Sequence, residues 1–332
     1  MKTKVSTDFQ KSCESFFCCT GINLSECKSG LRGEAIFRNV PRRFFIKVLN
    51  GSFNMDVPEQ LVQVGMRVRQ FDGCIAHGTA EIIGCLPRES ALIMEYIPGC
   101  NLEQILRRTL WGVRAWSDPP FRRVAEVLAS LNRIHAEDVG IEAHGRTNGS
   151  FRHKLESLWK ESAVARWLPP RYRDMSELYK LLASNWQNHV LCRLLLADSQ
   201  PKNVIVSPEG AKFIDLDFGF GHPSLEVAGF LLGLDRLAFR APMPHQRKLV
   251  RHWKHMFLEA YLGVCESKEM ILEDLFFFYP WVLLSGWEQH CTYWPGMKPG
   301  LAMFYGLRLR RFLCALQTAR NTGKNILDCP TW

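Results

Sequence analysis

The chain has 332 residues, a length that suggests one large domain or two small ones. Hydrophobic residues make up 47% and charged residues 23%, which excludes a disordered or fibrous chain. The 42 Lys and Arg against 33 Asp and Glu give a formal net charge of +9. The arginines form small clusters spread along the whole chain, and no nucleic-acid-binding motif is present, so we expect no nucleic-acid partner.

The cysteine and hydropathy patterns bear on localisation. The 12 cysteines are scattered without a CxxC pair, which argues against a cysteine-rich zinc site, and free thiols in this number are typical of a reducing compartment. Residues 1–20 lack the apolar segment of a secretory signal. The longest nearly uncharged apolar stretch, residues 275–287, is shorter than the roughly 20 residues that span a bilayer. We therefore expect a cytoplasmic protein.

The first hundred residues predict mainly strands with one helix. Apolar β-favouring runs alternate with turn signals, and Pro58 opens a segment with apolar residues at helical spacing. The expected strands are residues 35–37, 44–49, 80–85 and 91–96, and the expected helix is 58–71. Pro98 and Gly99 then break the pattern.

Helices dominate the rest of the chain. Asn101 is a suitable cap for a helix over 102–110, and further helices are expected over 121–136, from about 170 to 188, and from 225 onward. Short apolar strands are expected at 191–197, 204–206 and 212–214. The layout predicts an α+β fold in which a small, strand-rich lobe over residues 1–98 precedes a larger, mainly helical lobe over 99–332.

The most informative residues follow the short strands of the second lobe. An apolar strand leads to Asp198, Asn203 comes five residues later, and Asp215 follows a further apolar strand. Phosphoryl transfer needs a carboxylate that orients the attacking hydroxyl and accepts its proton. It also needs an amide oxygen and a second carboxylate that hold Mg²⁺ against a triphosphate. The pattern predicts an ATP- and Mg²⁺-dependent kinase. The alternative is an ordinary turn, in which Asp and Asn are common.

This pattern resembles the protein-kinase-like superfamily, in particular its aminoglycoside phosphotransferase and choline kinase branch. That branch has an H-G-D-x-x-x-x-N loop, which is similar to the segment from Leu196 to Asn203. Three further segments are similar to family motifs, in the family's order: residues 92–99 to the hinge, 128–136 to an L-A-x-L-H helix, and 221–228 to G-D-P-x-x-D-L-A. The resemblance covers about residues 30–230 and implies a two-lobed fold with an antiparallel sheet in the first lobe.

The resemblance implies a role for each matching residue. Asp198 would be the catalytic base, and Asn203 and Asp215 would bind the metal. Lys47 would hold the α- and β-phosphates, with Glu59 as the carboxylate placed to pair with it. The alternative readings are a strand lysine at the surface and a first-turn acid that suits the helix dipole.

The same resemblance assigns the nucleotide-binding backbone. Groups near Glu95 and Ile97 would meet the adenine, and Gly30 and Gly33 would belong to a loop over the phosphates, with ordinary hairpin glycines as the alternative. Asp217 could share or take the metal-binding role of Asp215, which we favour because it is predicted to end the strand.

Several positions depart from the family pattern. Leu196 and Ala197 replace the family's loop histidine and glycine, and His222 replaces an aspartate. These departures keep a second hypothesis open, a pseudokinase or nucleotide-binding scaffold without transfer activity. The intact Asp198, Asn203, Asp215 and Lys47 favour the kinase.

The acceptor is less well defined by the sequence. Residues 275–305 are rich in aromatic side chains, which indicates either helical core or a wall for a sugar, an amine or a lipid head group, including a surface for peripheral membrane contact. Trp287 and Glu288 are a candidate acceptor-binding pair. The net charge favours a neutral or anionic hydroxyl acceptor, such as a small molecule or a cell-envelope sugar or glycan. The oligomeric state is not predicted.

Overall fold

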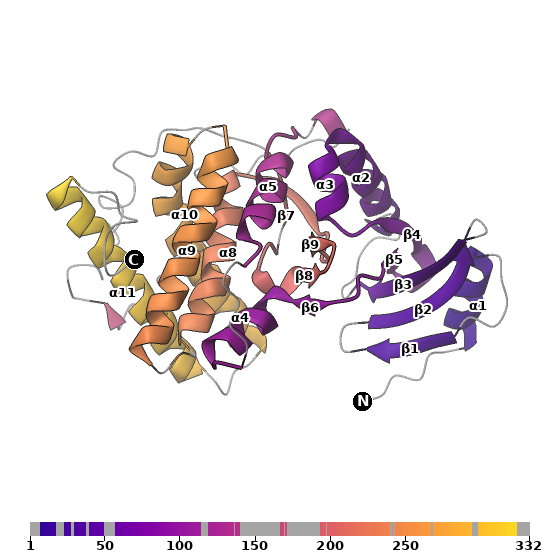
Figure 1. Ribbon diagram of the computed structural model, residues 1–332, viewed down its shortest axis with the longest axis horizontal. Coiled ribbons are helices and arrows are strands. Elements are labelled where there is room, and N and C mark those ends of the chain that lie inside the picture. Colours follow the sequence, from indigo (N-terminus) through magenta and orange to yellow (C-terminus); the bar gives the residue numbers. More distant parts are fainter. Residues whose placement is uncertain are drawn as a thin grey trace.

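The structure is a computed structural model that describes residues 7–17, 23–27, 30–37, 40–49, 57–113, 119–135, 137–139, 167–168, 170, 193–196, 198–239, 241, 243–266, 268–293 and 298–323. The helices are α1 (Thr7–Phe17), α2 (Val57–Phe71), α3 (Gly73–Gly78), α4 (Leu102–Leu110), α5 (Phe121–Leu131), α8 (Pro223–Phe239), α9 (Pro244–Val264), α10 (Lys268–Tyr293) and α11 (Lys298–Thr322). The strands are β1 (Asn23–Cys27), β2 (Gly30–Phe37), β3 (Val40–Val48), β4 (Ile82–Leu86), β5 (Ala91–Glu95), β6 (Cys100–Asn101), β7 (Arg193–Leu196), β8 (Val204–Ser207), β9 (Gly210–Phe213) and β10 (Phe218–Gly221). Figure 1 shows two lobes, with the larger sheet at one end and the long helices at the other.

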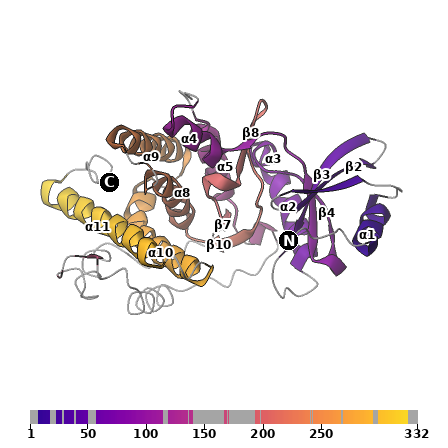
Figure 2. The same cartoon turned by 90° about the horizontal axis from the view of Figure 1, so that it is seen from below.

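A five-stranded antiparallel sheet forms the first lobe, in the order β1-β2-β3-β5-β4. Helix α1 lies on one face and α2 on the other (Figure 2). Side chains alternate along β3, as the period of a strand requires. Phe44 and Ile46 are buried on the α1 face, where the ring centroids of Phe44 and Phe17 are 4.4 Å apart. Lys47 therefore lies on the opposite face, which is turned toward the second lobe.

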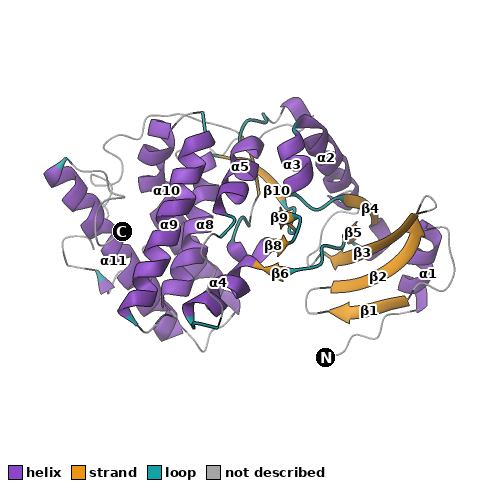
Figure 3. Ribbon diagram, viewed as in Figure 1, coloured by secondary structure: helices purple, strands orange, loops and turns teal. Residues whose placement is uncertain are grey.

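Short strands occupy the region between the two lobes, as the orange elements of Figure 3 show. Strands β6, β8 and β9 form one small antiparallel sheet, and β7 pairs with β10 in another. The second lobe is built around α8, which packs between α9 and α10, while α11 packs on α10. In this core the ring of Phe230 on α8 stacks on that of Phe257 on α9, with centroids 4.1 Å apart.

A buried group of polar side chains joins the four long helices. Asp235 of α8 accepts a hydrogen bond from Tyr279 of α10 and pairs with Arg308 of α11 at 2.7 Å. Lys254 of α9 lies 3.4 Å from the same carboxylate. Burial lowers the pKa of Lys254 to about 7, with the neighbouring Arg308 adding to the effect and Asp235 opposing it. These contacts fix the helices relative to one another beneath the candidate site.

Most predicted elements are present, with informative differences at their ends. Helix α4 has the predicted bounds, and the Asn101 side chain accepts a hydrogen bond from the Gln104 N–H at 2.8 Å. Helix α5 ends at Leu131 instead of residue 136, and the side chain of the C-cap residue Asn132 forms tertiary hydrogen bonds. Elements α1, α3, β1, β6 and β10 were not predicted, and the described part of the first hundred residues holds three helices where one was expected. The helix expected at 170–188 lies outside the described residues.

Two expectations about the whole chain can be compared with the described part. None of the described helices has a long enough apolar stretch to cross a membrane. Within the described residues, Cys13, Cys74, Cys85, Cys100, Cys265 and Cys314 are free thiols. These six cysteines therefore take part in no disulfide.

Candidate active site

The loop after β7 carries the predicted catalytic carboxylate. Asp198 follows the strand closely, and a 3-10 turn, Pro201–Asn203, leads into β8. Asn203 stabilises the loop, since its Nδ2 donates a hydrogen bond to the Asp198 carbonyl at 2.9 Å. Because this contact uses the amide nitrogen, the Asn203 oxygen Oδ1, which could bind a metal, is not consumed by it. We call the segment from Asp198 to Asn203 the catalytic loop.

Asp215 lies beside this loop. The Ile214 N–H donates to the Asn203 carbonyl at 2.9 Å, which joins the segment after β9 to the catalytic loop. Strand β9 ends at Phe213, so the expectation that Asp215 ends the strand is wrong by two residues. The chain leaves the ladder before the two aspartates, Asp215 and Asp217, and both therefore lie in irregular backbone between β9 and β10.

The first lobe contributes Lys47 to the same place. Its Nζ forms an ion pair with Asp215, across 168 positions of sequence. The two side chains are half-buried, with exposed fractions of 27% for Lys47 and 30% for Asp215. The predicted partner Glu59 instead lies exposed in the first turn of α2, and Lys47 forms no ion pair with it in the described structure. Asp215 takes that place, so the ion pair joins β3 to the segment between β9 and β10.

The electrostatics of Asp217 show that the acidic residues lie close together. Protein atoms around its carboxyl remove part of its hydration and raise its pKa, even though the side chain is open to solvent on one side. Lys47 opposes the rise, while Asp215 and Asp198 add to it. Carboxylates from two segments and a lysine from the other lobe therefore share one site.

Asp198 has one carboxylate oxygen paired and one without a partner. Its Oδ2 lies 2.7 Å from Lys202 Nζ, within the catalytic loop. Its Oδ1 is buried and accepts no hydrogen bond from any described residue. A buried carboxylate oxygen without a donor costs free energy, so this atom is suited to accept a hydrogen bond from a bound hydroxyl.

The side chains of this site provide some, but not all, of the ligands that a bound Mg²⁺ needs. Asp215, Asp217 and the Asn203 amide provide the oxygen ligands that Mg²⁺ prefers. Among the residues that the structure describes, no three His, Cys, Asp or Glu side chains are close enough to hold a metal by themselves. A site of this kind is completed by phosphate oxygens and water, which is the usual arrangement for Mg²⁺. The buried Oδ1 of Asp198 and the carboxylates that lie around Lys47 are consistent with a bound Mg²⁺.

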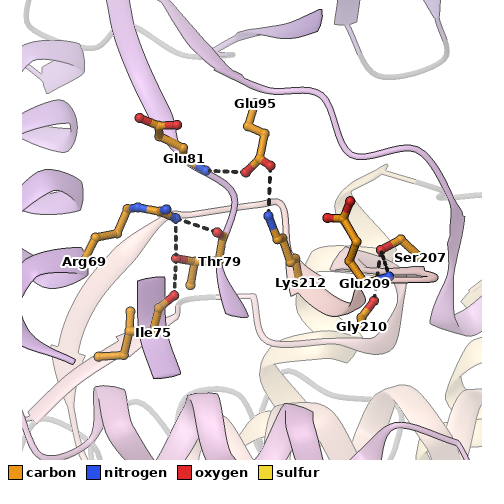
Figure 4. Close-up of polar contacts among 9 residues, drawn as sticks. All are labelled: Arg69, Ile75, Thr79, Glu81, Glu95, Ser207, Glu209, Gly210 and Lys212. Carbon is orange, nitrogen blue, oxygen red and sulfur yellow. Dashed lines mark hydrogen bonds and ion pairs between the residues drawn. The ribbon is translucent and has the colours of Figure 1, made fainter. Parts of the chain in front are cut away.

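Figure 4 shows the polar contacts of Glu95, which belongs to the predicted hinge. Glu95 at the end of β5 accepts a hydrogen bond from Lys212 Nζ at 2.9 Å and one from the Glu81 N–H at 3.2 Å. These contacts engage the side chain of Glu95 and join β5 to β9. The N–H of Ile97 donates to no other described residue. Within the described residues it is therefore an unengaged backbone donor.

The glycines of the predicted phosphate loop lie in a strand. Gly30 pairs with Cys27 at the start of β2, and Gly33 pairs with Phe44 within it. A Cβ atom at Gly33 would lie 2.5 Å from Phe44 Cζ. The missing side chain at Gly33 therefore makes room for a core ring, which corrects its placement in a loop. Gly30 is the first residue of β2, and its contact with a phosphate stays a prediction.

Glu226 on α8 is a site residue to which the sequence analysis gave no role. Its carboxylate accepts hydrogen bonds from the Leu196 N–H at 2.7 Å and from Asn132 Nδ2 at 3.0 Å. Its carbonyl accepts one from Ser199 Oγ at 2.9 Å. These bonds hold both flanks of Asp198. Burial raises the pKa of Glu226 to about 8, against the lowering effect of the two hydrogen bonds. Its position in the segment 221–228, which is similar to a family motif, is the sequence feature that could have indicated this role.

Two of the three departures from the family pattern, Leu196 and His222, occupy buried positions. Leu196 is in the core, and Ala197 lies outside the described residues. His222 is buried with its ring stacked on Phe278, and its Nε2 lies 2.7 Å from Asp274 of α10. His222 therefore joins the start of α8 to α10 and does not reach the acidic site through any of these contacts.

The aromatic segment is largely core in the described residues. Phe278, Tyr279, Phe304 and Tyr305 are buried, and Trp287 packs edge-on against Tyr305 with centroids 6.4 Å apart. This supports the helical-core interpretation over an open aromatic wall for these residues. Glu288, its predicted partner in acceptor binding, is exposed.

Comparison of the sequence with protein-family models and with curated proteins finds no significant match. The fold, in contrast, is similar to that of several solved structures. A glucosamine kinase in complex with glucosamine, ADP and inorganic phosphate superimposes with a TM-score of 0.61 and 11% identity, over 96% of this chain and 89% of that chain. The macrolide 2'-phosphotransferase MphH of Brachybacterium faecium gives 0.51 and 14%, over 90% and 98%. A microcompartment-associated aminopropanol kinase gives 0.50 and 12%, over 92% and 94%. These likenesses establish a two-lobed, protein-kinase-like α+β fold.

Proposed function

We propose that this chain is an ATP- and Mg²⁺-dependent phosphotransferase that acts on a hydroxyl group of a small molecule. The observation that carries the proposal is the ion pair between Lys47 of the first lobe and Asp215, beside the loop of Asp198 and Asn203. The sequence predicted each of these residues for one reaction, and they come from distant parts of the chain. The compared structures of the same fold are kinases and phosphotransferases, one of them with ADP bound.

Each residue has a defined part in the proposed reaction. Asp198 Oδ1 accepts the hydrogen bond of the acceptor hydroxyl and takes its proton as the oxygen attacks the γ-phosphorus. The bond from the γ-phosphorus to the β,γ-bridging oxygen breaks, and ADP leaves. Lys47 donates to the α- and β-phosphates, and the N–H of Ile97 donates to the adenine.

Asn203 Oδ1 and Asp215 would hold Mg²⁺, with Asp217 as a further ligand. The bound metal neutralises negative charge on the phosphates during transfer. In the present arrangement Lys47 balances the charge of Asp215 itself. Glu226 holds the backbone on both sides of Asp198 and is a positioning residue.

A nucleotide-binding scaffold without transfer is the competing hypothesis. The ion pair of Lys202 with Asp198 favours it, since it occupies one oxygen of the proposed base. The departures at Leu196 and His222 also favour it. The two hypotheses differ in turnover and agree in nucleotide binding.

Thermal stabilisation by ATP, measured with and without Mg²⁺, tests the nucleotide site. Wild type should show a Mg²⁺-dependent rise in the melting temperature, because a ligand well above its Kd stabilises the fold. Asp215→Ala should lose this dependence, while Glu209→Ala, an exposed acid on the β8–β9 turn, should keep it. No shift at millimolar ATP contradicts the nucleotide site.

A measurement of turnover then distinguishes the phosphotransferase from the nucleotide-binding scaffold. ADP release with a panel of sugars and amino alcohols should depend on Mg²⁺ and be abolished in Asp198→Asn, which keeps the size of the side chain. Mg²⁺-dependent binding of ATP without transfer to any acceptor in the panel favours the scaffold. Near-normal turnover of Asp198→Asn refutes the assignment of the base.

A further inference from the structure

Arg236 connects the catalytic loop to the helices that follow it. Its Nη1 donates to Gln200 Oε1 at 2.6 Å, and its Nη2 donates to Tyr305 Oη at 3.2 Å. Helix α10 approaches the same group, since a Cβ at Gly286 would lie 3.4 Å from Arg236 Nη2. Gln200 is two residues from Asp198, so their Cα atoms are at most about 7.6 Å apart. Arg236 therefore bonds to the loop that carries Asp198, two residues from the proposed base.

The charge of Arg236 is not balanced within the described residues. Both hydrogen-bond partners, Gln200 and Tyr305, are neutral. Arg236 forms no ion pair with a described residue, and its Nε is buried without an acceptor among them. Arg308, in the same lobe, is paired with Asp235 at 2.7 Å. A guanidinium stays charged at any physiological pH, and shielding it from water without an opposing carboxylate costs free energy.

The catalytic loop has no further carboxylate that could bind a cationic acceptor. Between Asp198 and Asn203 the one carboxylate is that of Asp198, which the proposed reaction uses, and the loop also carries Lys202. Lys202 lies 2.7 Å from Asp198 and is partly exposed. An acceptor bearing an ammonium group would meet two positive side chains here, and like charges at a binding site oppose association.

We propose that the acceptor carries an anionic group, a carboxylate or a phosphate, that binds Arg236 while its hydroxyl lies against Asp198. The planar fork of arginine matches both groups and gains a charge-assisted hydrogen bond through Nε. The inference rests on the proposed function, because it assigns the acceptor class of the same site.

Four compounds with one carbon skeleton test the charge directly: D-glucose, D-glucosamine, D-glucuronate and D-glucose 6-phosphate. Thermal shifts of the full chain are measured with each at equal concentration, in saturating Mg·ADP so that phosphate-binding groups of the nucleotide site are occupied. We expect at least one anionic compound to raise the melting temperature more than glucose, and glucosamine to have no such effect. The two anionic compounds distinguish carboxylate from phosphate as the preferred group.

Variants of Arg236, with an exposed lysine as control, test whether this residue binds the anion. Arg236→Gln should lower the affinity for the favoured anion about ten- to hundredfold, as expected for the loss of charged hydrogen bonds. Lys248→Gln, which removes an exposed charge of α9, should leave it unchanged. Arg236→Lys keeps the charge without the fork, so the order of the four compounds should persist with weaker anion binding. This variant maintains the test if Arg236→Gln fails to fold.

Other outcomes overturn the proposal. These are an equal response to all four compounds, no response to any, an anion preference that survives in Arg236→Gln, or a preference for glucosamine. In the last case Glu288→Gln would show whether that exposed acid binds the amine. Stabilisation by Mg·ADP alone is recorded separately, so loss of the nucleotide site and loss of the anion site are distinguishable.

Discussion

Glu226 provides a direct test of the catalytic-loop geometry. It is fully buried, and its two carboxylate oxygens accept hydrogen bonds from the Leu196 N–H and from Asn132 Nδ2. Burial without a cation raises its pKa from 4.5 to about 8. The fold therefore holds this carboxyl in its neutral form at pH 7. We predict that Glu226→Gln, which mimics the neutral form, removes a specific pH dependence of stability.

The sign and size follow from proton linkage. The unfolded chain releases the proton near pH 4.5, whereas the folded chain keeps it to about pH 8. The contribution of the neutral carboxyl to stability is complete below about pH 4.5 and is lost as the pH rises to about 8. Between these values the free energy of unfolding of wild type should fall by about 1.4 kcal/mol per pH unit relative to Glu226→Gln. Above pH 8 the difference should level off.

The measurement is urea unfolding of both proteins at several values between pH 5.5 and 9. The amide at position 226 changes one hydrogen bond to Asn132, but that offset does not vary with pH. Glu209→Gln, an exposed acid, serves as the matched control and should run parallel to wild type. A constant difference between wild type and Glu226→Gln over pH 5.5 to 7.5 would refute the reasoning, because the buried carboxyl would then be ionised.

Three further predictions concern packing and capping. Asp235→Asn leaves Arg308 and Lys254 without their buried carboxylate, so it should lower the free energy of unfolding in urea by about 3–5 kcal/mol. The control Glu34→Gln, in the exposed pair with Arg43, should lower it by less than about 1 kcal/mol. Gly33→Ala should lower the free energy of unfolding by about 1–3 kcal/mol, since its Cβ would lie 2.5 Å from Phe44. The control Gly263→Ala on α9 has open space around its Cβ and should be neutral or stabilising. A loss at Gly263 equal to that at Gly33 would contradict the steric account. Asn101→Ala should cost about 1 kcal/mol in thermal unfolding through loss of the α4 cap, and an unchanged melting temperature would show that the cap is redundant.

The proposed anion site and the proposed nucleotide site depend on different residues. Lys47 of the first lobe meets Asp215, whereas Arg236 of α8 bonds to Gln200 of the catalytic loop and to Tyr305 of α11. A chain with the same catalytic residues and a different side chain at position 236 would keep its nucleotide chemistry. Acceptor choice in this fold can thus change through residues that local sequence motifs do not include.

Much of the local structure follows from the sequence alone. Asn101 caps α4 because its side chain reaches the N–H of Gln104, a contact within four residues. Apolar residues at helical spacing mark α2, and a β-favouring apolar run marks β3. Asp198, Asn203 and Asp215 were found from their order after short apolar strands. These features depend on neighbours in the chain, which is why pattern and propensity reveal them.

Other features depend on contacts between distant segments. Strand β10, with the sequence FGFG, has little intrinsic strand preference and exists because it pairs with β7. Lys47 lies next to Asp215 and not Glu59 because of how β3 is placed over the catalytic loop. The tertiary structure likewise decides that Glu226 is buried and neutral and that Arg236 lacks an acidic partner among described residues. Burial and partnership across the fold set the energy of a charge, and neither can be read from its neighbours in sequence.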